Sequence, residues 1–261
     1  MLRIACVLGK MVQFMEEEKT YEDHPFEVTT PVFLEEAKEL RKSLQTMDFK
    51  SLQSLWKCSE KLVRKNMEEL LELDLTRQVT PALLAYEGIQ YQYMAPQIFT
   101  TEQWKYATEH LRILSGFYGV LKPSDGVIPY RLEMQSRMET TRGKDLYAFW
   151  EKRIYEELVR DESVIVNLAS KEYSKAVEAY KEENIQWINC IFGERKDGKI
   201  KVKGTLAKMA RGEMVRWMAE NQIENMEDIK AFQGLDFVYE PDCSSEENLV
   251  FLQREKETPG V

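Results

Sequence analysis

A short continuous run of apolar and β-branched residues, SVIVNL at 163–168, constrains the fold more than any other segment. Its length and composition predict a buried strand, and the residues after Ala169 predict a turn into a helix. A strand that runs into a helix is the repeating unit of α/β proteins. Ligands bind at such turns, so Asn167, Ser170 and Tyr173 are candidate contacts. Ser170 has the alternative role of a helix cap.

Further strands are predicted on both sides of this one. Residues 2–8 form an apolar run that ends at Gly9, which would bring Lys10 to the edge of a sheet where it can face a ligand. The sequence KDG at 196–198 is a hairpin turn signal. The other predicted strands are 185–192 and 199–206, which flank that turn, and 235–239 and 249–253.

Helices are predicted where apolar residues recur at spacings of three and four after a capping residue. The predicted starts are Thr30-Pro31, Asp48, Ser59, Thr80-Pro81 and Thr100 or Thr101. Residues 91–94, YQYM, either fill the core or line a cleft. No segment is long and polar enough to be a linker, so the chain is predicted to be one α/β domain over 1–261, a mixed central sheet with flanking helices.

The composition of the chain excludes several classes of function. The chain has 36 basic and 45 acidic residues, a net charge of −9, with four scattered cysteines and two histidines. Without a C-x-x-C pair or histidine cluster, no disulfide framework, metal site or cofactor is expected. The apolar runs are too short to span a membrane, and no secretory signal is recognisable. We therefore expect a cytoplasmic protein without a membrane partner.

The charge is unevenly distributed. Between Arg195 and Arg216 there are eight basic and two acidic residues, a net charge of +6, which leaves −15 for the remainder. The segment is either a solvated hairpin and helix face or one half of an electropositive cleft that includes Lys208 and Arg211.

The segment 101–122 predicts two helices joined by a glycine turn. Trp104, Ala107, Leu111 and Leu114 recur at helical spacing before a G-F-Y-G sequence. A helix that stops at Gly116, turns through Gly119 and restarts near Lys122 outlines a helix-hairpin-helix, whose turn amides approach phosphates. The spacing is one residue longer than the usual G-x-G, so an ordinary αα-corner is the alternative.

Two arginines in the following segment are further candidates. Arg131 follows Pro129 in an irregular stretch, where polar residues are often functional. Arg142 and Lys144 flank Gly143 at a predicted helix start, with Asp145 near the positive end of that helix.

The chain resembles the YaaA peroxide-stress family. The resemblance is carried, in family order, by HLRILSGFYGVLKPSD (110–125), PYRLEM (129–134), RGKDLYAFW (142–150), VIVNLASKEY (164–173), LAKMARGEMVRWM (206–218) and SSEENLVFLQRE (244–255). It implies a cytoplasmic bacterial protein with one compact α/β domain and a helix-hairpin-helix element. It also implies a positively charged cleft that binds double-stranded or distorted DNA, and a role in limiting peroxide damage from unincorporated iron.

Carried over residue by residue, the resemblance places in the cleft Lys10, Arg131, Arg142, Lys144, Asn167, Ser170, Tyr173, Lys208 and Arg211, with Gly116 and Gly119 in the hairpin turn beside Lys122. The family's first strand usually ends I-S-P-A-K, whereas this chain reads CVLGK at 6–10 and keeps only the lysine. Lys171 stands where relatives often have aspartate, and Met209 where some have a basic residue.

Two principal hypotheses follow. The first is a monomeric DNA-binding stress protein, whose binding should weaken steeply with salt. The second is an enzyme that acts on a small phosphate-bearing or nucleotide-like ligand in the same cleft, since Lys10, Arg131 and Asn167 come from several strand ends. A third, peroxide chemistry at a cysteine, is disfavoured because Cys6 lies in a predicted buried strand and Cys243 in an acidic loop.

Overall fold

The computed structural model describes residues 2–7, 27–77, 79–160 and 162–254. Within these residues an eight-stranded mixed sheet has the order β4-β3-β1-β6-β7-β10-β9, with β8 paired to β7. Strands β3, β1, β6, β7 and β10 run parallel, and β4, β8 and β9 run antiparallel to their neighbours. The strands are β1 (Leu2–Val7), β3 (Leu111–Ser115), β4 (Gly119–Leu121), β6 (Val164–Leu168), β7 (Gln186–Lys196), β8 (Lys199–Lys201), β9 (Phe237–Tyr239) and β10 (Asn248–Gln253).

This sheet confirms the predicted α/β class. Each of the predicted strands at 2–8, 163–168, 185–192, 235–239 and 249–253 is present, with ends that differ by a few residues. The predicted hairpin is also confirmed, because β7 and β8 pair across a turn in which Asp197 and Gly198 have φ of 53° and 72°. Its second strand is shorter than predicted, since a helix begins at Gly204.

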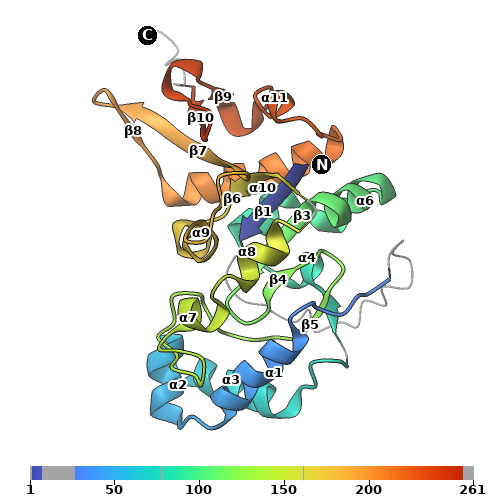
Figure 1. Ribbon diagram of the computed structural model, residues 1–261, viewed down its shortest axis with the longest axis vertical. Helices are drawn as coiled ribbons and strands as arrows, with labels where there is room; N and C mark the ends of the chain where they lie inside the picture. The colour runs from blue at the N-terminus through green and yellow to red at the C-terminus, as the bar shows by residue number, and fades with distance from the viewer. Residues whose placement is uncertain (1, 8–26, 78, 161, 255–261) are drawn as a thin grey trace, which may run out of the picture.

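Helices pack around the sheet (Figure 1). The long helix α10 packs against α5 at Gly212, where a Cβ would lie 2.0 Å from the Gln90 carbonyl oxygen. Tyr91 and Met94 of α5 are buried, so the YQYM segment contributes to the core. The helices of this part are α4 (Ala82–Ala85), α5 (Ile89–Met94), α6 (Thr101–His110), α8 (Arg153–Leu158), α9 (Lys171–Glu178), α10 (Gly204–Glu220) and α11 (Met226–Ile229).

A second group of helices lies at the lower end of the molecule in Figure 1. It consists of α1 (Leu34–Gln45), α2 (Phe49–Trp56), α3 (Glu60–Glu72) and α7 (Leu146–Trp150). Helix α1 buries Ala37, Leu40 and Leu44, which recur at helical spacing on one face. The Asp48 carboxylate caps α2 by accepting from the Ser51 N–H at 2.8 Å, as predicted.

Two predicted helix starts are wrong. Helix α1 begins at Leu34, three residues after Pro31, and Phe33 occupies its N-cap position without a side-chain bond. Thr80 and Pro81 form the short strand β2, which pairs with β5 (Gly126–Val127), and α4 begins only after it. In contrast, Thr100 caps α6 in a capping box with Gln103.

The predicted helix-hairpin-helix is wrong. Helix α6 ends at His110, and residues 111–115 are the fully buried strand β3, paired antiparallel with β4. The G-F-Y-G sequence is therefore the turn of a β-hairpin. None of the helices in the described ranges is long and apolar enough to cross a membrane.

Candidate functional site

Arg131 joins two distant parts of the chain. Its Nε donates to the carbonyl oxygen of Trp56, the last residue of α2, at 3.0 Å. The preceding residue, Tyr130, shares a 2.7 Å hydrogen bond with Ser115 at the carboxyl end of β3. The irregular segment that carries both residues is thus fixed to the sheet on one side and to α2 on the other.

A cavity of about 810 Å³ opens between α2 and residues 131–137. Lys50, Lys57, Arg131 and Arg137 contribute four positive charges to its wall, and Glu133 contributes one negative charge. Met47, Leu55 and Trp56 supply apolar surface. The volume falls in the range of small-molecule sites, roughly 300–1,000 Å³. This cavity is hereafter called the α2 cavity.

The positive charge at the α2 cavity is not neutralised by neighbours. Lys50, Lys57 and Arg137 are exposed, and none of them forms an ion pair with a described residue. Elsewhere, by contrast, Lys181 holds Glu247 at 2.9 Å and Arg216 holds Glu220 at 2.7 Å. In a chain of net charge −9, an uncompensated cluster of cations attracts anions.

A buried hydroxyl network lies beside this segment, at the end of β3. The Tyr130 hydroxyl bonds both Ser115 Oγ and the Tyr86 hydroxyl, at 2.7 and 2.8 Å. The backbone N–H groups of Phe117 and Tyr118 donate to Ser115 Oγ. Burial raises the pKa of Tyr86 and of Tyr130 above 10, so both stay protonated and can donate hydrogen bonds.

The predicted contacts at the end of β6 have different environments. Asn167 is buried, donates to Asn189 Oδ1 at 2.7 Å and accepts from the Ala169 N–H, so its amide is used within the sheet. Ser170 occupies the N-cap position of α9 but makes no side-chain capping bond. Tyr173 is buried, and desolvation raises the pKa of its hydroxyl.

One contact connects this turn with the segment that bears Arg131. The Gln135 N–H donates to Glu172 Oε1 in the first turn of α9, at 3.1 Å. This contact joins the segment 131–137 to the first turn of α9. Lys10 lies outside the described residues, as do Leu8 and Gly9 of the altered strand ending.

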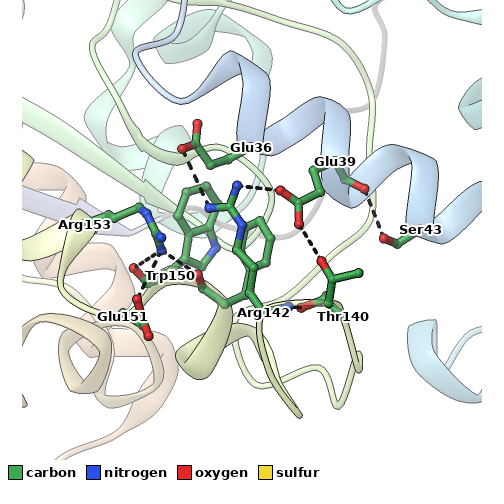
Figure 2. Close-up of polar contacts among 10 residues, drawn as sticks. Glu36, Glu39, Ser43, Thr140, Arg142, Trp150, Glu151 and Arg153 are labelled. Atoms are coloured by element: carbon green, nitrogen blue, oxygen red, sulfur yellow. Dashed lines mark hydrogen bonds and ion pairs between the residues drawn. The ribbon is translucent and has the colours of Figure 1, made fainter.

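Arg142 is held by α1 (Figure 2). Its guanidinium lies 2.5 Å from Glu39 and 3.9 Å from Glu36, and it stacks over the Phe149 ring at 4.9 Å. Arg142 thus connects the turn before α7 to α1, and the two glutamates of α1 largely neutralise its charge. Lys144 is exposed, and Asp145 caps α7 through the Ala148 N–H, which confirms the predicted helix start.

The two turn glycines are required for packing. Gly119 has a φ of 70°, and a Cβ there would lie 2.9 Å from the Phe33 and Trp150 rings. A Cβ on Gly116 would lie 2.6 Å from the Leu132 carbonyl oxygen, and the Gly116 carbonyl accepts from Trp150 Nε1. The following Lys122 is exposed and donates its backbone N–H to Asp125.

Residues 194–203, here called the basic arm, form the hairpin of β7 and β8 beyond the part of β7 that pairs with β6 and β10. From Arg195 onward every residue of the arm is exposed, and β7 and β8 project from the body in Figure 1. Lys196 stands directly opposite Lys199, and neither forms an ion pair with a described residue. Lys208 is exposed on α10.

Arg211 is half-buried and lies near Cys190. Burial raises the pKa of the Cys190 thiol to about 12, with Arg211 acting in the opposite direction, so this thiol stays protonated. Cys243, which was predicted to lie in an acidic loop, has a basic neighbour, since Arg195 donates to its Sγ at 3.4 Å. The described residues hold no group of three histidine, cysteine or acidic side chains that could bind a metal ion.

Sequence reasoning missed most of the wall of the α2 cavity. Lys50 lies in the first turn of α2, whereas Lys57 follows its last residue in the left-handed conformation, so helical spacing does not place both lysines on one face. Arg137 gave no local signal either, because only the fold brings residues 131–137 to α2.

Comparison with known proteins identifies the family. A family model described as peroxide stress protein YaaA matches residues 10–243. The chain belongs to the YaaA peroxide-stress family. Its relatives in that family include UPF0246 proteins of Pediococcus pentosaceus, 49% identical over 231 residues (88% of this chain and 92% of the relative), and of Lachnoclostridium phytofermentans, 48% identical over 225 residues (86% and 88%). The UPF0246 protein of Lactiplantibacillus plantarum is 44% identical over 225 residues (86% and 91%).

Proposed function

We propose that this YaaA-family protein is a cytoplasmic peroxide-stress protein that binds DNA as a monomer and helps to limit iron-dependent oxidative damage. The basic arm provides the main phosphate contacts. The observation that carries the proposal is the Lys196–Lys199 pair at its tip. Like charges directly across a strand pair destabilise a hairpin, and a bound phosphate would relieve that repulsion.

The shape of the arm supports the same conclusion. A two-stranded antiparallel ribbon fits the DNA major groove, where basic side chains reach the flanking phosphates. Ile200 and Val202 are exposed on the arm at 37% and 54% of their surfaces, which provides apolar contact beside the lysines. Lys208 adds a further exposed charge at the start of α10.

The test is Lys196→Gln combined with Lys199→Gln. Binding to duplex and bubble DNA is measured by fluorescence anisotropy between about 50 and 200 mM salt. Wild type should bind more weakly as salt rises, and the slope of log K against log salt should fall by about 2 in the variant, since two phosphate contacts are lost.

The matched control is Lys61→Gln with Lys105→Gln, two exposed lysines on α3 and α6 that change the net charge equally. The control should retain the wild-type slope. Equal slopes for wild type and the arm variant, or equal losses in both variants, would exclude the arm as the DNA contact.

A further inference from the structure

We propose that the α2 cavity is a second site, which binds a small phosphorylated ligand with a flat apolar group, of the nucleoside diphosphate class. This inference is independent of DNA binding by the basic arm. It rests on the shape of the cavity, on its charge and on the chemistry of one wall residue.

The charge of the wall selects an anion. Lys57 and Arg137 approach the cavity from opposite segments, and neither is neutralised by a described carboxylate. Arg131 has its Nε fixed on the Trp56 carbonyl oxygen, which sets the orientation of its guanidinium plane at the wall. A planar guanidinium held in one orientation suits bidentate recognition of phosphate oxygens.

The rest of the wall indicates that the ligand is more than a free phosphate. Met47, Leu55 and Trp56 contribute apolar surface. Trp56 is only 5% exposed, and its indole N–H has no acceptor among the described residues. The wall therefore combines cations with apolar surface, which matches a ligand that carries both a phosphate and a flat apolar group.

The size of the cavity excludes a duplex as its occupant. About 810 Å³ accommodates a drug-sized molecule, whereas a nucleic-acid duplex would need an open groove. The α2 cavity and the basic arm are built from different elements, α2 with residues 131–137 on the one hand and β7 with β8 on the other. The two sites can therefore be inactivated separately.

The probe is ADP, with inorganic pyrophosphate and adenosine as its two halves, and binding is measured by isothermal titration calorimetry. Lys57→Gln with Arg137→Gln should weaken ADP binding by at least about tenfold, because two phosphate partners are lost. Adenosine and pyrophosphate should each bind more weakly than ADP. Circular dichroism and thermal unfolding establish that the variant is folded, as both side chains are exposed.

The arm variant Lys196→Gln with Lys199→Gln is the matched control, since it changes the net charge equally. It should retain ADP binding, and the cavity variant should retain DNA binding. Absence of ADP binding to wild type at millimolar concentration, or equal binding to the cavity variant, overturns the proposal whatever the result with DNA. If ADP binds no more tightly than pyrophosphate, the proposal that the cavity binds a flat apolar group is overturned.

Discussion

Two arginines illustrate how immediate neighbours decide the role of a side chain. Arg131 and Arg142 both follow irregular backbone and were equal candidates in the sequence. Glu36 and Glu39 of α1 neutralise Arg142, whereas Arg131 opens onto a wall with three further cations. Arg142 therefore stabilises the fold, whereas Arg131 lies in the wall of the α2 cavity.

We expect Arg142→Gln to lower the free energy of unfolding by about 1 kcal/mol, because half-exposed ion pairs and stacked cations each contribute less than that. Urea unfolding measures the change. DNA and ADP binding should stay at wild-type levels. A loss of either activity in the folded variant would show that Arg142 belongs to a binding site.

The buried carboxyl of Asp125 should make the stability of the fold depend on pH. Burial raises the pKa of its carboxyl above 3.8, although the Thr29 hydroxyl and the Lys122 N–H donate to it. The folded state then binds the proton more tightly than the unfolded state, so this group's contribution to stability falls as the pH rises through the raised pKa. Wild type should therefore gain stability relative to Asp125→Asn as the pH is lowered from about 7 to about 4. Urea unfolding across this range measures the difference, and a constant difference would contradict the assignment.

At the scale of elements, close contact between backbones fixes the position of α10. Gly212 allows α10 to lie against the Gln90 carbonyl of α5, and no other residue type leaves that space. Side-chain amides also connect three parallel strands. Asn167 of β6 donates to Asn189 of β7, and Asn189 donates to Asn248 of β10. These contacts hold α10 against α5 and align β6, β7 and β10.

Gly212→Ala should lower the free energy of unfolding by about 3 kcal/mol, since the added methyl group meets backbone that cannot rotate away. Gly204→Ala in the same helix is the control, because a Cβ there has open space, and it should be neutral or slightly stabilising. Thermal and urea unfolding compare the two. Equal stabilities would mean that α5 and α10 are not in close contact.

For the whole molecule, the relevant property is how charge is separated. The net charge is −9, yet the basic arm and the α2 cavity each carry uncompensated cations. The rest of the surface is acidic and repels anions, so phosphates would be attracted to the basic arm and to the α2 cavity.

The sequence predicted the sheet well and the glycine turn poorly, for one physical reason. Buried parallel strands read as continuous apolar runs, which 2–7 and 164–168 show plainly. Residues 111–115 are another such run, but Leu111 and Leu114 also continue the spacing of α6, so periodicity alone could not separate helix from strand. The α2 cavity needs contacts between segments far apart in the chain, which no local pattern contains.

The central place of β1 has a consequence for synthesis. Ile4 pairs with Leu111 and Leu2 with Val164, so this strand is made more than a hundred residues before either partner. Because the ribosome adds roughly 5–20 residues per second, β1 remains unpaired for on the order of ten seconds before its partner strands are made. An apolar strand left open for that long is a natural target for a nascent-chain chaperone, and the sheet can close only late in translation.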